Sequence, residues 1–183
     1  MSFLPLQTER LTLRVYALSD IPALVPLIGA GEVAATTLRI PHPYSESYAR
    51  DFIAKAQEDL ASGSCLRLAI VLRERDTLCG GVGLQIEREH GRAELGYWIG
   101  VPYWGNGYAT EAARSVVNYG FGTLGLHRIF ASHFTNNPAS ARILRKIGMR
   151  HEGSLRGHIL KWGEFLDLEM YGMLASDMDR SAT

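Results

Sequence analysis

The stretch AELGYWIGVPYWGNGYATEA, residues 93–112, combines three local patterns without a break. Its first residues alternate in polarity as in a β-strand, and Glu94 lies near the start of that strand. Gly105 and Gly107 then form a short loop, and helix-forming residues begin at Tyr108. The sequence therefore predicts a strand, a glycine loop and a helix start in immediate succession.

This succession is suited to binding a phosphate group. The first turn of a helix presents unpaired amide N–H groups and the positive end of the helix dipole. Glycine lacks a Cβ, so a ligand can approach the backbone of Gly105 and Gly107 closely. Two ordinary turn glycines are the alternative interpretation. A single charge–dipole contact is worth only about 0.3–1 kcal/mol, so a phosphate site requires several converging amides.

Two common nucleotide-binding loops do not match this stretch. A Walker loop requires a lysine after its last glycine, but Tyr108 follows Gly107. A dinucleotide-binding loop requires GxGxxG, and Thr110 occupies the position of the third glycine. GFGTLG at residues 120–125 matches that pattern, but it follows a predicted helix and precedes a strand, which is the reverse of the required context. We interpret residues 120–125 as a helix terminator, which disfavours a nicotinamide-dependent oxidoreductase.

The remaining sequence predicts an α/β (α+β) fold with a mixed, mostly antiparallel central sheet of about six to seven strands, flanked by about four helices. Residues 1–183 are expected to form one domain with a polar tail from about residue 176, and Pro26 is expected to bend or end the first helix. The predicted strands span residues 10–15, 65–72, 78–87, 93–100, 127–134, 150–160 and 164–174. The predicted helices span residues 19–30, 45–63, 108–121 and 136–149.

Nineteen basic and nineteen acidic residues give the 183-residue chain a formal net charge of zero. This balance does not indicate a nucleic-acid-binding surface, so we expect no direct contact with nucleic acid. No run of about 18 apolar residues predicts a membrane span, and residues 1–15 do not resemble a signal peptide. Cys65 and Cys79 form no CxxC motif, so both thiols are expected to be buried and the location cytoplasmic. The six histidines show no metal-binding spacing, and no metal site is predicted.

Residues 93–112, together with NNPASARILRKIGM at residues 136–149, resemble the GNAT N-acetyltransferases. The resemblance is closest to their RimJ/RimL-type branch, which includes ribosomal-protein N-terminal acetyltransferases, and it extends over nearly the whole chain. It implies the GNAT fold and acetyl transfer from acetyl-coenzyme A (acetyl-CoA) to a primary amine. In that family the loop and the helix start bind the pyrophosphate of acetyl-CoA. The end of the preceding strand binds the pantetheine arm through its backbone.

Transferred residue by residue, the resemblance implies that Ile99 and Val101 contact pantetheine and that the amides of residues 105–110 bind the pyrophosphate. The family pattern is [Q/R]-x-x-G-x-[G/A], and Pro102 occupies its Gln/Arg position. This departure removes a side-chain contact to phosphate but leaves binding by the backbone amides. The implied acetyl-CoA-binding residues are Ile99, Gly100, Val101, Trp104, Gly105, Asn106, Gly107, Tyr108, Ala109, Thr110 and Asn137.

Acetyl transfer to an amine requires a neutral nitrogen, stabilisation of the carbonyl oxygen and a proton for the leaving thiolate. At about pH 7.4, deprotonating a lysine side chain costs about 4 kcal/mol, whereas an α-amine costs less than about 1 kcal/mol. A strong base is therefore necessary for a lysine acceptor and dispensable for a protein N-terminus.

Glu94 is the candidate general base. Alternation places its side chain on the strand face opposite to that of Leu95 and Tyr97. Its position in the strand resembles that of the general-base glutamate in some GNAT enzymes. The alternative is a carboxylate at the sheet edge that pairs with a cross-strand arginine such as Arg92 or Arg88.

NPAS at residues 137–140 has both a structural and a functional interpretation. Asn137 is a favourable N-cap residue, and Ser140 falls at the third helical position. The family motif N-x-x-S implies instead that Asn137 contacts pantetheine and that Ser140 donates a proton to the thiolate. The two interpretations are compatible. Three cations of the same helix could meet the 3′-phosphate or remain solvated: Arg142, Arg145 and Lys146.

A protein N-terminus, for example of a ribosomal protein, is the acceptor that the branch resemblance implies. A polyamine, an amino acid or an aminoglycoside is an alternative acceptor. A non-catalytic coenzyme-A-binding sensor is a further alternative, and the presence of Glu94 and Ser140 favours the enzyme. A monomer and a homodimer both agree with the sequence. Trp162, in a predicted hairpin turn, could border the acceptor site, contact a partner or form a plain hairpin tip.

Overall fold

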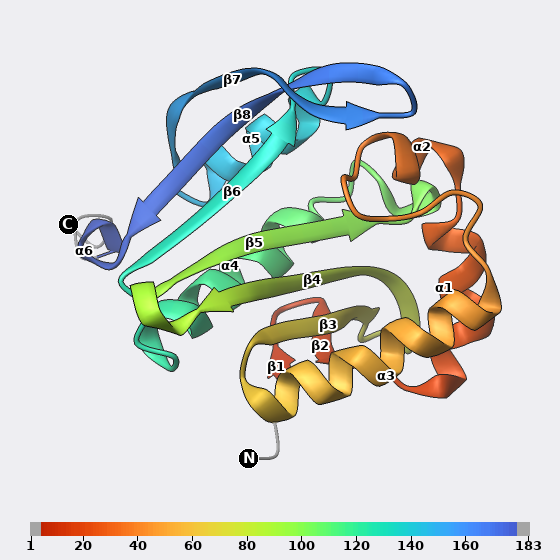
Figure 1. Cartoon of the computed structure of the whole chain (residues 1–183). Coiled ribbons are helices and arrows are strands. Elements are labelled where there is room, and N and C mark those ends of the chain that lie inside the picture. Colours follow the sequence, from red (N-terminus) through yellow and green to blue (C-terminus); the bar gives the residue numbers. More distant parts are fainter. Residues whose placement is uncertain (1–4, 179–183) are drawn as a thin grey trace.

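The computed structural model describes residues 5–178, in which eight strands form one twisted sheet (Figure 1). The strand order is β1-β2-β3-β4-β5-β6-β8-β7, and only the pair β5–β6 is parallel. The sheet is thus mixed and mostly antiparallel, as predicted. The strands are β1 (Leu6–Gln7), β2 (Leu11–Val15), β3 (Cys65–Leu72), β4 (Thr77–Glu87), β5 (Arg92–Ile99), β6 (Arg128–Phe134), β7 (Arg150–Lys161) and β8 (Glu164–Leu174).

Helices α1 and α3 cover one face of the sheet, and α4 and α5 cover the other (Figure 1). The α-helices are α1 (Ile21–Ile28), α2 (Gly31–Ala35), α3 (Glu46–Ser62), α4 (Tyr108–Gly122), α5 (Pro138–Lys146) and α6 (Ala175–Met178). Four helices thus flank the sheet as predicted, whereas the sheet has one strand more than the predicted six to seven, and α2 and α6 are short additional helices. Strand β1 has two residues, and α2 and α6 have five and four, so none shows a detectable period.

Two further predictions concern the effect of Pro26 on the first helix and the polar C-terminal tail. Pro26 lies inside α1, which ends at Ile28, so the helix ends early as expected. The polar tail is expected to begin at about residue 176, and α6 extends into it as far as Met178. Residues 179–183 of that tail lie outside the described part of the chain.

Alternating side chains of β3 supply both apolar cores. Leu68 and Ile70 pack with Ala112 and Val116 of α4, in the core that α4 and α5 share with the sheet. Ala69 and Val71, which alternate with them, belong to the second core, which lies beneath α1 and α3. Burying one such aliphatic side chain contributes about 1.5–3 kcal/mol. Period-2 alternation in a central strand thus fixes helices on both faces of the sheet.

The sheet opens between β5 and β6. Their pairing is limited to Arg92–Glu94 of β5 with Arg128–Phe130 of β6. Beyond Glu94 the two strands diverge (Figure 1). A parallel pair requires a crossover connection, which α4 provides. Residues 95–99 of β5 therefore present one edge to a space that no strand fills.

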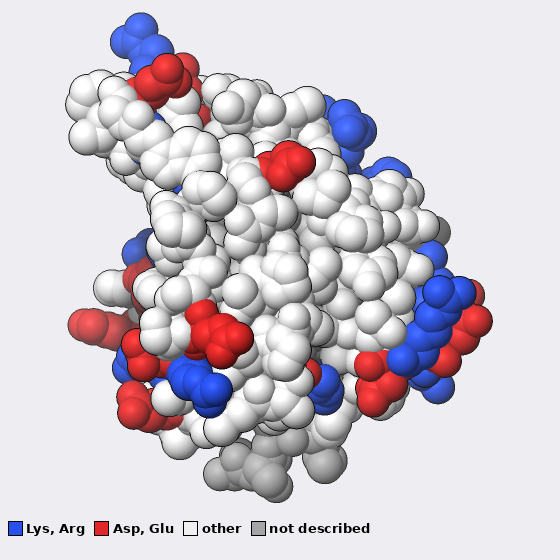
Figure 2. Space-filling model, turned by 90° about the vertical axis from the view of Figure 1, so that its right-hand side faces the viewer, with Lys and Arg blue, Asp and Glu red and all other residues white. Residues whose placement is uncertain are grey.

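Figure 2 shows the face on which α1 and α2 lie. Acidic and basic side chains are intermixed at its margins, and its centre is largely uncharged. Across residues 5–178, no three His, Cys, Asp or Glu side chains come together in a way that could hold a metal ion. None of the helices described there is long and apolar enough to cross a membrane.

Candidate functional site

A cleft of about 990 Å³ runs along the open edge of β5 and joins the loop before α4 to the segment between α2 and α3. Three of the residues predicted for the site do not line it: Gly100, Val101 and Asn106. The predicted residues that do line it are Glu94, Ile99, Trp104, Gly105, Gly107, Tyr108, Ala109, Thr110, Asn137 and Ser140. One strand, two helices and a loop thus bring most of the predicted residues to one cleft.

The glycine loop leaves the start of α4 open to a ligand. Gly105 and Gly107 have φ values of 80° and 81°, a left-handed conformation that favours glycine. A Cβ added to Gly105 would project into open space. No side chain caps the N-terminus of α4, whereas Ser45 caps α3 and Asn137 caps α5. The amides at the start of α4 are therefore available to an anion, and the loop fits a pyrophosphate.

Arg10, just before β2, holds this loop in place. Its Nη1 donates to the carbonyl of Asn106 at 3.0 Å, and its guanidinium pairs with Glu111 of α4 at 2.7 Å. The guanidinium also lies 4.8 Å from the ring centroid of Tyr108. Burial opposes ionisation of Glu111, but hydrogen bonds from Thr8 and Arg10 hold the pKa of Glu111 below its usual value. The ion pair between Arg10 and Glu111, together with the hydrogen bond to Asn106, thus fixes the glycine loop and the start of α4 to the segment before β2.

The end of β5 departs in part from what the family resemblance implies. The indole Nε1 of Trp104 donates to the carbonyl of Ile99 at 2.6 Å, so that carbonyl is already engaged. The amide of Gly100 donates to the carbonyl of Cys79 at 2.9 Å. Asn106 directs its amide back to the carbonyls of its own turn, which explains its absence from the cleft. Free backbone groups for a ligand therefore lie mainly along β5 before Ile99.

Glu94 forms an ion pair with a residue that the sequence did not indicate. Arg39, between α2 and α3, donates from Nη2 to Glu94 Oε2 at 2.8 Å and from Nη1 to Gln85 Oε1 at 2.7 Å. Gln85 and Glu94 are cross-strand partners on β4 and β5, so Arg39 bridges a registered pair. Oε1 of Glu94 accepts no hydrogen bond from any residue in the described range.

The alternative partners considered for Glu94 are therefore wrong. Arg92 pairs with Glu87 at 2.7 Å, and Arg88 donates to the carbonyl of Gly63 at 3.3 Å. Both arginines lie near the turn between β4 and β5, and their partners lie there too. The carboxylate of Glu94 thus faces the cleft rather than the sheet edge.

Asn137 and Ser140 occupy the N-terminus of α5 as the capping pattern predicts. The Oδ1 of Asn137 accepts a hydrogen bond from the Ser140 amide at 3.2 Å, which confirms the cap. The Ser140 hydroxyl is buried and lies 2.7 Å from the hydroxyl of Tyr97. Burial raises the pKa of Tyr97 to about 12, although the hydrogen bond with Ser140 opposes that effect. The cleft therefore contains a pair of protonated hydroxyls beside the open edge of β5.

Sequence reasoning missed Tyr97, Arg39 and the aromatic wall beyond Glu94. Alternation placed Tyr97 on the same strand face as core residues, so nothing distinguished it from the core. Arg39 lies in a segment without periodicity. Of the α5 cations, Arg142 and Lys146 line this cleft, whereas Arg145 does not. The aromatic residues on the wall are Tyr16, Tyr44, Tyr48, Phe52 and Trp98.

Two relatives resemble the chain over different lengths. The uncharacterised N-acetyltransferase p20 of Bacillus licheniformis is 36% identical over 171 residues, which cover 92% of this chain and 95% of the relative. YdaF of Bacillus subtilis, described as a candidate ribosomal N-acetyltransferase, is 31% identical over 104 residues, 56% of this chain and 57% of YdaF. The similarity to p20 covers nearly the complete length of both proteins.

A third relative and a solved structure extend this comparison. Spermidine N(1)-acetyltransferase of Escherichia coli is 33% identical over 82 residues, 45% of this chain and 44% of the relative. The structure of an acetyltransferase of the GNAT family from Bacillus anthracis superimposes with a TM-score of 0.84 at 26% identity, covering 94% and 99% of the two chains. A model of the acetyltransferase (GNAT) domain matches residues 10–150. This match, the long alignment with p20 and the shared fold show that the chain belongs to the GNAT family of N-acetyltransferases.

Proposed function

We propose that the protein transfers the acetyl group of acetyl-CoA to an α-amine, with a protein N-terminus as the acceptor. The observation that carries this proposal is the continuous cleft that joins the uncapped start of α4 to Glu94, past the hydroxyl of Ser140. The resemblance to the candidate ribosomal enzyme YdaF and to the RimJ/RimL-type branch supports a protein acceptor.

The part of the cleft beside the glycine loop and the start of α4, here called the donor half, fits acetyl-CoA, which family members use as the acetyl donor. The amides of residues 108–110 and the glycine loop can bind the pyrophosphate, since they combine unpaired N–H groups with the positive end of α4. Arg142 and Lys146 line the same half and bring positive charge. Acetyl-CoA supplies a thioester, whose carbonyl carbon is the electrophile.

The remaining residues provide the proton transfers of a direct attack. Oε1 of Glu94 accepts a proton from the acceptor ammonium, and the neutral nitrogen attacks the thioester carbon. As the new C–N bond forms, the C–S bond breaks, and the Ser140 hydroxyl donates a proton to the leaving sulfur. Either hydroxyl can donate across the 2.7 Å between Tyr97 and Ser140, and we assign Tyr97 as the donor, which directs the serine proton toward the leaving sulfur. The nitrogen also loses its second proton, which passes to the Ser140 oxygen and restores the hydroxyl, and Glu94 releases its proton to water. The ammonium and the thioester thus give one amide, one thiol and one proton, and the enzyme is regenerated.

The cysteines agree with direct attack rather than an acyl-enzyme. Burial raises the pKa of the Cys79 thiol to about 12, and it also raises the pKa of Cys65. The hydrogen bond from Cys79 goes to the carbonyl of Ile70 rather than to a base. A thiol with a raised pKa is a weak nucleophile near neutral pH.

A small-molecule amine is the second candidate acceptor, and the similarity to a spermidine acetyltransferase supports it. A screen with acetyl-CoA separates the candidates by following coenzyme A thiol release. The acceptors are peptides with a free N-terminus, the same peptides N-terminally blocked with a free lysine, spermidine, amino acids and an aminoglycoside. We expect the fastest release with free peptide N-termini, and mass spectrometry locates the acetyl group.

Two results of this screen would contradict the proposal. Binding of acetyl-CoA without thiol release from any amine would support a coenzyme-A-binding sensor instead. Faster acetylation of spermidine or of blocked lysine peptides would assign a different acceptor. Thermal shift with acetyl-CoA and with NADH provides a separate check, because stabilisation by NADH alone would contradict binding of acetyl-CoA.

A further inference from the structure

Arg39 places a guanidinium beside the candidate base on the wall of the cleft. Two of its N–H groups bond to Gln85 and Glu94, which leaves three of the five donors of a guanidinium without a partner among residues 5–178. Its side chain is 63% exposed and lines the cleft. Arg39 can therefore donate further hydrogen bonds to a molecule in the cleft without releasing Glu94.

Glu94 and Arg39 together present two complementary groups side by side. Oε1 of Glu94 is free to accept an N–H of the acceptor, and the neighbouring guanidinium is free to donate to an oxygen. A fragment that carries an amine and a carbonyl or carboxylate oxygen on adjacent carbon atoms matches this arrangement. Every α-amino group of a peptide or an amino acid belongs to such a fragment. The ε-amine of lysine and the amines of spermidine do not.

We propose that Arg39 determines acceptor specificity by binding the oxygen on the carbon next to the amine-bearing carbon, so that the acceptors are α-amino carbonyl compounds. This inference rests on the proposed function and specifies its acceptor. Two kinds of acceptor carry this oxygen: a protein N-terminus, in its first peptide carbonyl, and a free amino acid, in its carboxylate. A charge-assisted hydrogen bond of this kind is worth about 1.5–3 kcal/mol, equivalent to about 10- to 150-fold in selectivity.

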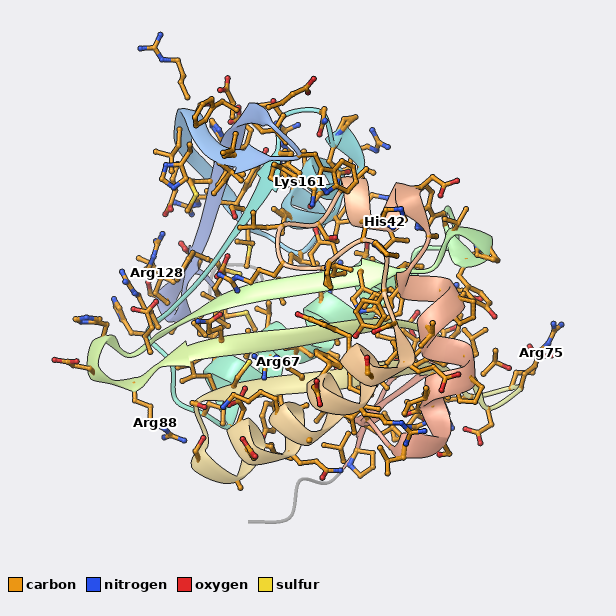
Figure 3. All side chains as sticks on the ribbon, turned by 45° about the vertical axis from the view of Figure 1, so that its right-hand side comes forward. His42, Arg67, Arg75, Arg88, Arg128 and Lys161 are labelled. Carbon is orange, nitrogen blue, oxygen red and sulfur yellow. The ribbon has the colours of Figure 1, made fainter. Side chains whose placement is uncertain are left out.

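The β7–β8 hairpin holds the segment that carries Arg39. The Lys161 ammonium, near the hairpin tip, donates to the carbonyl of Thr37, and it lies 4.8 Å from the ring centroid of Trp162. The ring of Trp162 contacts that of His42 at 6.1 Å between centroids. Figure 3 shows Lys161 beside the loop of His42. Contacts on both sides of Arg39 thus restrain its segment, which reduces the ordering cost when an acceptor binds.

The charges of the cleft disfavour a polyamine. Its lining contains two carboxylates, Asp51 and Glu94, and Glu94 is already paired with Arg39. The cations of the lining outnumber them: Arg39, Lys55, Arg67, Arg142 and Lys146. Lys55 and Arg67 pair with Asp59, and Arg142 and Lys146 lie in the donor half of the cleft. The carboxylate groups of the lining that a polycation could meet are few, namely Asp51 and the free oxygen of Glu94. The aromatic wall suits an apolar first side chain.

The test uses two amines that share an aromatic body. Phenylalaninamide carries the carbonyl oxygen next to its amine-bearing carbon, and 2-phenylethylamine lacks it. The ratio of their kcat/KM values is measured at one pH for the wild type, Arg39→Gln and Arg39→Lys. Their different amine basicities cancel when ratios are compared between variants. An effect of Arg39 through Glu94 would raise the ratio rather than lower it, because the more basic 2-phenylethylamine depends more on the base. We expect the ratio to fall about 10-fold or more in Arg39→Gln and partly in Arg39→Lys.

Arg75→Gln is the matched control, because Arg75 extends away from the body at the turn between β3 and β4 (Figure 3). It should leave both rates and the ratio unchanged. A peptide beginning with phenylalanine and free phenylalanine distinguish a carbonyl from a carboxylate as the bound oxygen. If Arg39→Gln keeps the ratio, Arg39 does not bind the acceptor oxygen; if it raises the ratio, Arg39 acts only through Glu94. In both cases the proposal is wrong.

A binding measurement separates this proposal from the proposed function. Calorimetric titration of the two amines into the complex with coenzyme A gives the same selectivity ratio without turnover. Selective, Arg39-dependent binding of phenylalaninamide would support the proposal even if no acetyl transfer occurs, in which case only the proposed function would fail. Equal binding of the two amines by the wild type would overturn the role of Arg39 and leave acetyl transfer intact.

Discussion

The hydroxyl oxygens of Tyr97 on β5 and Ser140 on α5 lie 2.7 Å apart. Because burial raises the pKa of Tyr97 to about 12, the tyrosine keeps its proton throughout the neutral range. A tyrosine that donates to Ser140 leaves the serine proton free for another acceptor. The pair thus links Tyr97, on the face of β5 that packs against α4, to the N-terminus of α5, where the N-x-x-S motif lies.

Removing either hydroxyl should slow the chemical step. We expect Ser140→Ala to lower kcat about 100-fold or more, since general acid catalysis contributes about 10²–10⁴-fold. Tyr97→Phe should lower kcat about 10-fold by removing one hydrogen bond. The double variant should be no slower than Ser140→Ala, because Tyr97 acts through Ser140. Steady-state thiol release provides all three values, and multiplicative losses in the double variant would refute the coupling.

Glu94→Gln should affect acceptors according to their basicity. The loss in kcat/KM should be much larger for a lysine-like amine than for an α-amine, because only the lysine-like amine needs about 4 kcal/mol of deprotonation. Both acceptors are compared at one pH near neutrality. Equal slowing of the two acceptors, or no slowing of either, would contradict the role of Glu94 as a base.

Gly107→Val should weaken binding of coenzyme A. A β-branched residue at φ 81° is strained by about 1–3 kcal/mol, and its side chain would obstruct the approach to the α4 amides. We expect at least a 10-fold higher dissociation constant by calorimetry. Gly122→Ala is the control, because this glycine ends the same helix and a Cβ there meets nothing within 4 Å. Unchanged affinity in Gly107→Val would exclude the loop as the phosphate site.

Asp20→Asn should destabilise the protein in a pH-dependent manner. Asp20 is buried, which alone would raise its pKa, but hydrogen bonds from Arg14 and the Ala17 amide lower that pKa below 3.8. A lowered pKa in the folded state contributes stability above the unfolded pKa, and this contribution is lost as the pH falls through the folded value. We expect a loss of about 1–3 kcal/mol at pH 7, as measured by urea unfolding.

The same comparison at acidic pH tests the cause. As the pH falls below the ordinary aspartate pKa of 3.8 and through the lower pKa of folded Asp20, the difference between wild type and Asp20→Asn should shrink, because the wild-type carboxylate becomes protonated. Glu89→Gln removes an exposed charge and should change stability by less than about 0.5 kcal/mol. A difference that stays constant from pH 7 to pH 3 would show that packing, rather than the charge pair with Arg14, makes Asp20 important.

Local signals in the sequence were sufficient for the strand, the loop and the helix start. Alternation in β5, two glycines and an uncapped helix start lie within twenty consecutive residues, so no distant contact was necessary to predict them. The cap at Asn137 was predictable for the same reason. Strand β1 could not be predicted, because two residues form a strand only through pairing with β2.

The acceptor side of the site depends on contacts between distant parts of the chain. Arg39 and Glu94 are 55 positions apart, and Lys161 reaches a carbonyl 124 positions away. Tyr97 lies on the core face of β5, where alternation predicts burial but no chemistry. Such pairs leave no periodic pattern, so only the folded arrangement identifies them.

The cleft beside the opening between β5 and β6 is lined by two separate parts of the chain, which can change independently during evolution. The lining residues that we propose for the acetyl donor come mainly from the stretch 97–146, whereas those that we propose for the amine come mainly from residues 16–67. Substitutions in the segment between α2 and α3 can therefore redirect the enzyme toward new amines while the donor remains the same. A graft of residues 36–44 between relatives is a direct way to exchange acceptor range.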